Sequence, residues 1–101
     1  MDLFWVSVAG LDPAETLAKY KGRVPLAHLK DKAKDTPNRF NETVDRSAFK
    51  EVGGGTVNWP QVLKAADAAG VEHYFVEQDQ TPGDPVESLR QSYAFVSKLS
   101  Y

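Results

Sequence analysis

The sequence predicts an α/β fold with about four parallel strands and three flanking helices. Apolar, strand-like runs alternate with helix-like segments along the chain, and this alternation is typical of a parallel sheet. The apolar runs are mostly continuous, as in sheets covered on both faces. With 101 residues, of which 42% are hydrophobic, the chain has a globular composition and the length of one domain at most.

Three helix starts are marked by residues that cap helices. Asp12 and Asp84 each precede a proline at the first helical position and a glutamate at the third. The first of these helices is expected to end near Lys21. A middle helix begins at Asn58 and ends at Gly70, a glycine suited to a C-cap. The last helix carries an apolar stripe at helical spacing, which consists of Val86, Leu89, Tyr93 and Val96.

Four apolar segments are predicted to be strands, and one connection between them is unusually long. The strand candidates are Leu3–Val8, Val24–Leu29, Phe49–Gly53 and His73–Glu77. Residues 30–50 are charged, contain a proline and lack a helical stripe, which predicts a long loop above the sheet. Long loops in compact domains are usually functional or mobile.

Bulk composition excludes several classes of protein. A net charge of −2 with interspersed signs argues against a nucleic-acid partner, which needs a basic patch. No apolar segment reaches the roughly 18 residues of a membrane span, so no membrane partner is expected. The absence of cysteine excludes disulfides and thiolate metal sites and is compatible with the cytoplasm.

Three side chains at or near strand candidates could form one site. Glu77 ends the last strand candidate, His28 occupies the corresponding point of an earlier one, and Asp2 stands near the chain start. The carboxyl ends of parallel strands are where α/β enzymes place metal ligands and acid–base groups. The alternatives are a solvated carboxylate at Asp2, a hydrogen-bonded core histidine at His28 and a structurally paired carboxylate at Glu77.

The glycines at 53–55 suggest a second kind of contact. Their backbone amides could approach a phosphate near the helix that begins at Asn58, or the segment could be only a flexible turn. Lys30, Asp31 and Gln78 are candidate contacts at the rim of the site.

Four segments together resemble a known family. Residues 2–5 (Asp-Leu-Phe-Trp), 28–31 (His-Leu-Lys-Asp), 52–59 (Val-Gly-Gly-Gly-Thr-Val-Asn-Trp) and 74–77 (Tyr-Phe-Val-Glu) are similar to the sugar phosphate isomerase/epimerases. These belong to the xylose isomerase-like TIM barrels, a superfamily that also holds endonuclease IV-type nucleases. The resemblance covers residues 1–101 and implies a single partial domain, the C-terminal half of a (βα)8 barrel with strands five to eight. It also implies that the strand body precedes Asp2, so that the chain is a fragment.

The resemblance implies a metal-dependent reaction. Asp2, His28 and Glu77 would hold a divalent ion, together with a glutamate from the missing half. Such a donor set suits Mn²⁺ or Mg²⁺, and also Co²⁺ or Zn²⁺. The ion would bind a sugar or sugar phosphate and stabilise an enediolate, while Glu77 would also move the proton. Trp5, Lys30 and Gly54 are the predicted substrate contacts, and Trp5 stands where many relatives have a histidine.

Three functions are compatible with the sequence. The first is an isomerase or epimerase, although the fragment alone is expected to be a poor catalyst because one base is absent. The second is a non-catalytic module that binds a sugar or phosphate, and the third is an inactive half-barrel scaffold. The raw sheet edges of a half barrel also predict self-association.

Overall fold

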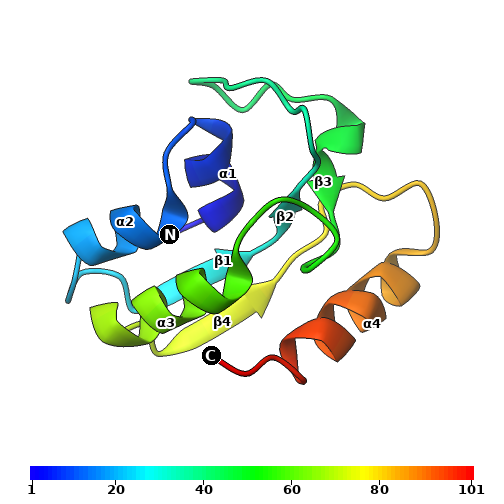
Figure 1. Ribbon diagram of the computed structural model, residues 1–101. Coiled ribbons are helices and arrows are strands. Elements are labelled where there is room, and N and C mark those ends of the chain that lie inside the picture. Colours follow the sequence, from blue (N-terminus) through cyan, green and yellow to red (C-terminus); the bar gives the residue numbers. More distant parts are fainter.

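The centre of the fold is a pair of parallel strands, and the computed structural model describes residues 1–101. Strand β1 (Leu26–Leu29) pairs with β4 (His73–Val76), with Leu26 opposite His73 and Leu29 opposite Val76 (Figure 1). The first two residues flank the other side of β1. There the His28 amide donates to the Met1 carbonyl at 2.8 Å, and Asp2 forms a parallel bridge with His28.

The predicted α/β class is confirmed, but the prediction of four parallel strands is wrong. Strands β2 (Asp31–Lys32) and β3 (Phe49–Lys50) form a separate antiparallel pair of two residues each. The chain cannot continue β3 to residue 53 because it turns directly afterwards: the Gly54 amide donates to the Glu51 carbonyl, and Gly53 has a positive φ.

Residues 3–8 are a helix, not the strand that their β-branched and aromatic residues predicted. Helix α1 (Leu3–Val8) begins because the Asp2 carboxylate accepts hydrogen bonds from the Phe4 and Trp5 amides at 3.0 and 3.2 Å. This N-cap overrides the strand propensity of the segment. The extended position beside β1 is occupied instead by Met1 and Asp2.

The three predicted helix starts are confirmed by cap geometry. Helix α2 (Pro13–Lys19) follows Asp12, α3 (Trp59–Ala69) follows Asn58, and α4 (Pro85–Val96) follows Asp84; each cap side chain accepts from an amide in the first turn. Helix α3 ends at Gly70 in the left-handed conformation, as predicted. Helix α2 ends at Lys19, two residues before the predicted end, and Tyr20 is its C-cap.

The core lies on one side of the parallel strands. Figure 1 shows α2 and α3 next to each other along β1, and Ala27 and Leu29 of β1 are buried on this side. On the opposite side of the strands, Leu26 and Phe75 are about half exposed. The main core cluster comprises Leu3, Ala14, Leu17, Val24, Ala27, Leu29, Val52, Trp59, Val62, Leu63, Ala66, Ala69 and Val71.

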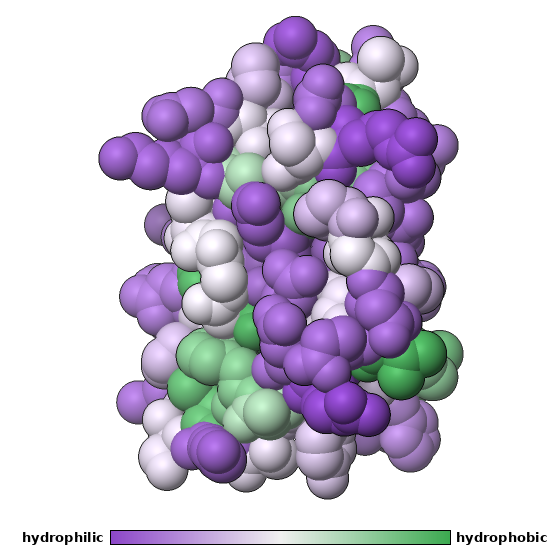
Figure 2. Space-filling model, turned by 90° about the vertical axis from the view of Figure 1, so that its right-hand side faces the viewer, coloured by the Kyte–Doolittle hydropathy of each residue, from purple (hydrophilic) through white to green (hydrophobic).

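Helix α4 contacts the rest of the molecule through two buried serines and, at its C-terminal end, through Phe95 and Val96, which pack against the core. Ser92 Oγ accepts from the Val52 amide at 3.0 Å, and Ser88 Oγ donates to Glu51 at 2.8 Å. The predicted apolar stripe is present, but three of its four members point outward with exposed fractions between 41% and 72%: Val86, Leu89 and Tyr93. Figure 2 shows apolar surface in the lower half of the molecule, at the height of α4 in Figure 1.

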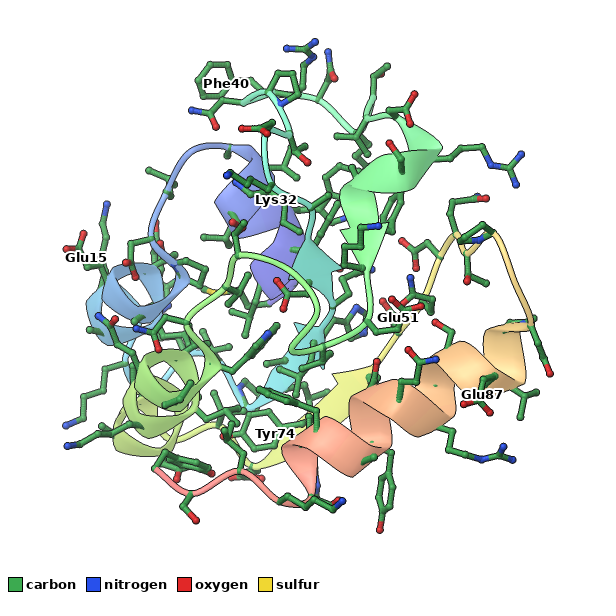
Figure 3. All side chains as sticks on the ribbon, turned by 45° about the vertical axis from the view of Figure 1, so that its right-hand side comes forward. Glu15, Lys32, Phe40, Glu51, Tyr74 and Glu87 are labelled. Atoms are coloured by element: carbon green, nitrogen blue, oxygen red, sulfur yellow. The ribbon has the colours of Figure 1, made fainter.

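The segment between β2 and β3 is mostly irregular. Residues 33–45 contain neither helix nor strand, and a short 3₁₀ helix (Arg46–Ala48) precedes β3. Phe40 lies at the outer tip of this segment and is 93% exposed (Figure 3). None of the helices is both long and apolar enough to cross a membrane.

Candidate metal centre

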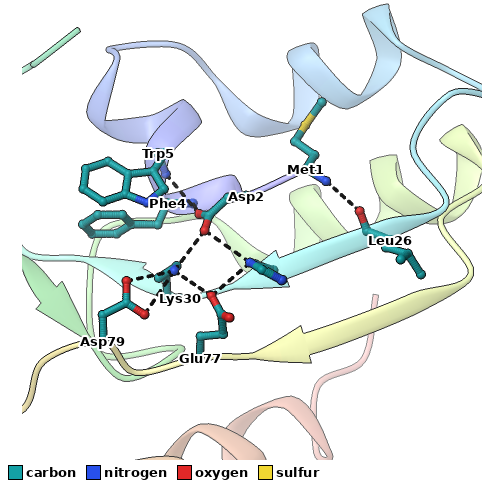
Figure 4. Close-up of polar contacts among 9 residues, drawn as sticks. Met1, Asp2, Phe4, Trp5, Leu26, Lys30, Glu77 and Asp79 are labelled. Atoms are coloured by element: carbon teal, nitrogen blue, oxygen red, sulfur yellow. Dashed lines mark hydrogen bonds and ion pairs between the residues drawn. The ribbon is translucent and has the colours of Figure 1, made fainter. Parts of the chain in front are cut away.

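The structure brings Asp2, His28 and Glu77 together at the carboxyl ends of three adjacent strand positions (Figure 4). Each offers one ligand atom, and these atoms lie within 4.8 Å of one another. His28 Nδ1 is 2.9 Å from Glu77 Oε2 and 3.4 Å from Asp2 Oδ2. Side chains that are up to 75 residues apart in the sequence thus meet in one cluster.

Local structure determines how each of these side chains is presented. The two oxygens of the Asp2 carboxylate have different partners: Oδ1 caps helix α1, while Oδ2 faces His28. His28 is the third residue of β1 and points to the side of the sheet opposite the core, next to Phe75 with ring centroids 6.1 Å apart. Glu77 extends the parallel ladder by one step, since its amide donates to the Leu29 carbonyl at 3.0 Å.

A buried lysine completes the cluster. Lys30 is 2% exposed, and its Nζ lies 2.7 Å from Glu77 Oε2, 2.9 Å from Asp2 Oδ2 and 3.1 Å from Asp79 Oδ2. Desolvation by burial lowers the pKa of Lys30, but the hydrogen bonds to Glu77, Asp2 and Asp79 together raise it more, so its pKa lies well above the ordinary value. The lysine is therefore a fixed positive charge.

Lys30 is held within the cluster, and its predicted contact with substrate stays a prediction. An ammonium group has three N–H donors, and here three carboxylates surround it. Asp79, which sequence reasoning missed, is one of these partners. Asp79 could have been found from the sequence, because a buried lysine needs carboxylate partners and Asp79 stands two residues after Glu77.

The residues present fit a divalent metal ion. Neighbouring ligands of an octahedral ion bonded at about 2.1 Å lie about 3 Å apart. The separations of His28 Nδ1 from the two carboxylate oxygens, 2.9 and 3.4 Å, are of this size. Two carboxylates and one imidazole form a donor set that suits Mn²⁺, Mg²⁺, Co²⁺ or Zn²⁺. Three carboxylates against one ammonium also leave the cluster negative, which attracts a cation.

Asp31 is not at the rim, where the sequence suggested it, but fully buried behind the cluster. Its carboxylate accepts from the Gly53 and Val57 amides, both at 3.0 Å, and from Trp59 Nε1 at 2.7 Å. Amides of the glycine-rich segment and of Val57 thus bind the Asp31 carboxylate.

Gly54, the predicted phosphate contact, lies outside the metal cluster. Its amide donates to the Glu51 carbonyl at 2.8 Å, so this donor is used within the turn. The rim candidate Gln78 lies between Glu77 and Asp79; its Nε2 donates to the Gln80 carbonyl, and its Oε1 is buried without a hydrogen-bond partner.

Trp5 lies beside the cluster as part of an aromatic group. Its ring packs edge-on against Phe4, with centroids 4.9 Å apart, and against Phe49 at 6.1 Å. Trp5 also lines a shallow pocket of about 590 Å³ that includes Asp2 and Phe40. An indole in this place can form a wall next to the candidate ligand Asp2.

Comparison with known proteins finds related sequences. The chain is 33% identical over 98 residues to the inosose dehydratase of Geobacillus thermodenitrificans (strain NG80-2), covering 87% of this chain and 33% of that protein. It is 32% identical over 100 residues to the inosose dehydratase of Clostridium perfringens (strain ATCC 13124), covering 89% of this chain and 34% of the relative. The chain therefore spans about a third of the length of these curated relatives. No model of a protein family matches it.

A solved structure supports the same relationship. The sugar phosphate isomerase/epimerase from Parabacteroides distasonis ATCC 8503 superposes with a TM-score of 0.70 and 26% identity, over 98% of this chain and 30% of that one. Sequence relatives and fold thus agree with the four motifs on which the resemblance was based. By sequence and by structure, the chain is thus related to the inosose dehydratases and sugar phosphate isomerase/epimerases of the xylose isomerase-like TIM-barrel group, and it matches about a third of each relative.

Proposed function

We propose that this chain carries part of the active site of a divalent-metal enzyme that removes a proton next to the carbonyl group of a sugar or a similar polyhydroxy ketone. The observation that carries the proposal is the cluster of Asp2, His28 and Glu77, whose ligand atoms lie within 4.8 Å of one another at strand ends. Enzymes of barrel architecture place their chemistry at these ends.

The residues of the cluster divide the chemistry between them. Asp2 Oδ2, a ring nitrogen of His28 and Glu77 Oε2 would hold the ion, for which Mn²⁺ and Mg²⁺ come first and Co²⁺ or Zn²⁺ are alternatives. When bound, the metal supplies Lewis-acid stabilisation for an enediolate. Glu77 Oε1 accepts no hydrogen bond within the chain, so this oxygen is free to take the substrate proton as a general base.

The outcome of the reaction depends on the step after proton removal. Return of the proton to the neighbouring carbon gives an isomer, return to the other face of the same carbon gives an epimer, and loss of a hydroxyl group gives a dehydrated product. The structural neighbour is named as an isomerase/epimerase, which supports the first two outcomes. The sequence relatives are named inosose dehydratases, which supports the third.

We expect the complete site to include groups from outside this chain. The parallel array contains β1, β4 and the Met1–Asp2 position, and the chain matches about a third of its relatives. Three strand positions and a third of the length correspond to about three strands of an eight-stranded barrel, rather than to the four of a half barrel. The fourth ligand and second acid–base group would come from the remainder.

Metal binding tests the proposal directly. We expect the wild-type chain to bind Mn²⁺, and His28→Ala or Glu77→Gln to weaken the binding at least 10-fold, because each removes a ligand. Isothermal titration calorimetry measures the affinity. His73→Ala is the matched control, since His73 lies at the opposite end of β4 and should leave binding unchanged. Equal affinities in all variants would refute the metal centre.

Proton exchange separates an enzyme from a binding module. Ketoses, sugar phosphates and inososes are incubated in D₂O with Mn²⁺ and the chain, and deuterium incorporation next to the carbonyl is followed by NMR. Exchange that is lost in Glu77→Gln supports the catalytic role, whatever the final product. Binding of metal and sugar without deuterium exchange would instead support the non-catalytic binding module. Absence of both binding and exchange would support the inactive scaffold.

A further inference from the structure

Lys30 and a metal ion would use the same oxygen atoms. Lys30 Nζ lies 2.9 Å from Asp2 Oδ2 and 2.7 Å from Glu77 Oε2. These are the two oxygens that also face His28 Nδ1, at 3.4 and 2.9 Å (Figure 4). The ammonium group therefore sits on the carboxylate oxygens of the candidate ligand set.

Of the three carboxylates around Lys30, only Asp79 lies outside the candidate ligand cluster. Both of its oxygens lie near Nζ, at 3.3 and 3.1 Å, and neither belongs to the candidate ligand cluster. Asp79 follows Glu77 by two residues, so β4 and the segment after it deliver one ligand carboxylate and one extra carboxylate to the same ammonium.

We propose that Lys30 is a built-in counter-cation which competes with a divalent ion for Asp2 and Glu77, and that Asp79 retains the ammonium when the ion takes their oxygens. This inference rests on the proposed metal centre. Without a metal, the ammonium holds two like-charged carboxylates together and keeps the ligands in place. With a metal, its positive charge opposes the ion, and Asp79 reduces that opposition.

The arrangement has a consequence for ion selectivity. A cation must displace an ammonium that is buried and contacts three carboxylates, so monovalent ions gain too little from Asp2 and Glu77 to compete. Lys30 is thus a positioning residue for the proposed centre: it orients two ligands and sets the affinity for the ion.

A double-mutant cycle on Mn²⁺ affinity tests the inference. Lys30→Met should bind Mn²⁺ about 10-fold more tightly than wild type, because the competing charge is gone. Asp79→Asn should bind about 5- to 10-fold more weakly, because the ammonium then depends on Asp2 and Glu77 alone. The Lys30→Met/Asp79→Asn double variant should behave like Lys30→Met, since no ammonium remains for Asp79 to hold.

The double variant distinguishes this arrangement from a simple charge effect. If Asp79 acted only as a distant negative charge, Asp79→Asn would weaken binding by the same factor in both backgrounds, and the inference would be overturned. Unchanged or weaker Mn²⁺ binding in folded Lys30→Met would overturn it as well. Circular dichroism and thermal unfolding establish that each variant is folded.

Two further variants keep the test decisive if Lys30→Met does not fold. Lys30→Gln retains polar contacts and should also tighten Mn²⁺ binding. Asp79 is exposed, and Asp79→Glu should restore the affinity lost in Asp79→Asn. An unchanged affinity in Asp79→Asn refutes the inference on its own. Failure of wild type to bind Mn²⁺ would instead refute the metal centre, and the inference with it.

Discussion

At the scale of single residues, Lys30 and Asp31 show how neighbours in the sequence serve different parts of the molecule. Lys30 turns toward the strand ends, where it contacts Glu77 and Asp2. Asp31 turns into the protein and accepts hydrogen bonds from two amides of the glycine-rich segment and from Trp59. Because the Asp31 carboxylate is fully buried, these hydrogen bonds replace the contacts with water that it loses on folding. One side chain organises the candidate centre, and the other organises the loop behind it.

Tyr74 offers a test of pH dependence at the same scale. Its hydroxyl donates to Asp67 at 2.9 Å, and burial raises the pKa of Tyr74, with the hydrogen bond and the charge of Asp67 adding to the shift. A folded-state pKa above the unfolded value means that the stabilising contribution is complete below about pH 10 and is lost as the pH rises through the folded pKa.

Tyr74→Phe should therefore lower the free energy of unfolding by about 0.5–1 kcal/mol at pH 7, and should reduce the loss of stability above pH 10. Urea denaturation between pH 7 and pH 11 measures both effects. Tyr93→Phe, at an exposed position of α4, is the control and should keep the wild-type pH profile. Identical profiles for the two variants would contradict the assignment.

At the scale of elements, caps and turns determine the helices and the loop behind the centre. Asp2 converts residues 3–8 into a helix and at the same time presents its second oxygen to the candidate centre. The turn at 53–57 wraps around Asp31, and this wrapping requires a residue without a side chain at Gly55. A Cβ atom there would lie 2.4 Å from Asp31 Oδ1 and 2.4 Å from the Lys32 carbonyl oxygen.

Gly55→Ala should accordingly destabilise the fold by about 2 kcal/mol, because the added methyl group must displace Asp31 or the backbone of Lys32. Chemical denaturation gives the free energy of unfolding. Gly83→Ala is the matched control, since a Cβ atom at Gly83 meets nothing within 4 Å, and its effect should stay below about 0.5 kcal/mol. A Gly55→Ala variant as stable as Gly83→Ala would show that the loop can move away from Asp31.

At the scale of the whole molecule, one side of the parallel strands and one side of α4 are left uncovered. Leu26 and Phe75 are exposed on the strands, Leu89 and Tyr93 are exposed on α4, and the outer edge of β4 has no paired strand. Unpaired strand edges next to apolar surface favour association. We propose that a second copy of the chain covers these exposed apolar residues and the free edge of β4.

Self-association is expected at tens of micromolar chain. Leu89→Glu should shift the population toward monomer, because it places a charge in the exposed stripe of α4. Sedimentation velocity measures the distribution, and Gln91→Glu on the same helix controls for the added charge alone. A stable monomer of the wild-type chain under these conditions would contradict the proposal.

The sequence alone determined the features that depend on near neighbours. The helix starts at Asp12, Asn58 and Asp84 follow from side chains that bind amides two or three residues away, so local reading located them. The meeting of Asp2, His28 and Glu77 near strand ends could also be predicted. Motif resemblance supplied the barrel family.

Tertiary structure decided what depends on distant partners. The burial of Asp31, the contact of Asp79 with Lys30 and the outward stripe of α4 were not predicted. The helical state of residues 3–8 was also missed, although its Asp2 N-cap is a local feature. The contacts at Lys30 and Asp31 join residues 20 or more positions apart, and their free energies appear only when the strands and loops assemble. A stripe at helical spacing predicts a helix, but whether a partner covers that stripe is decided by the assembled surface around it.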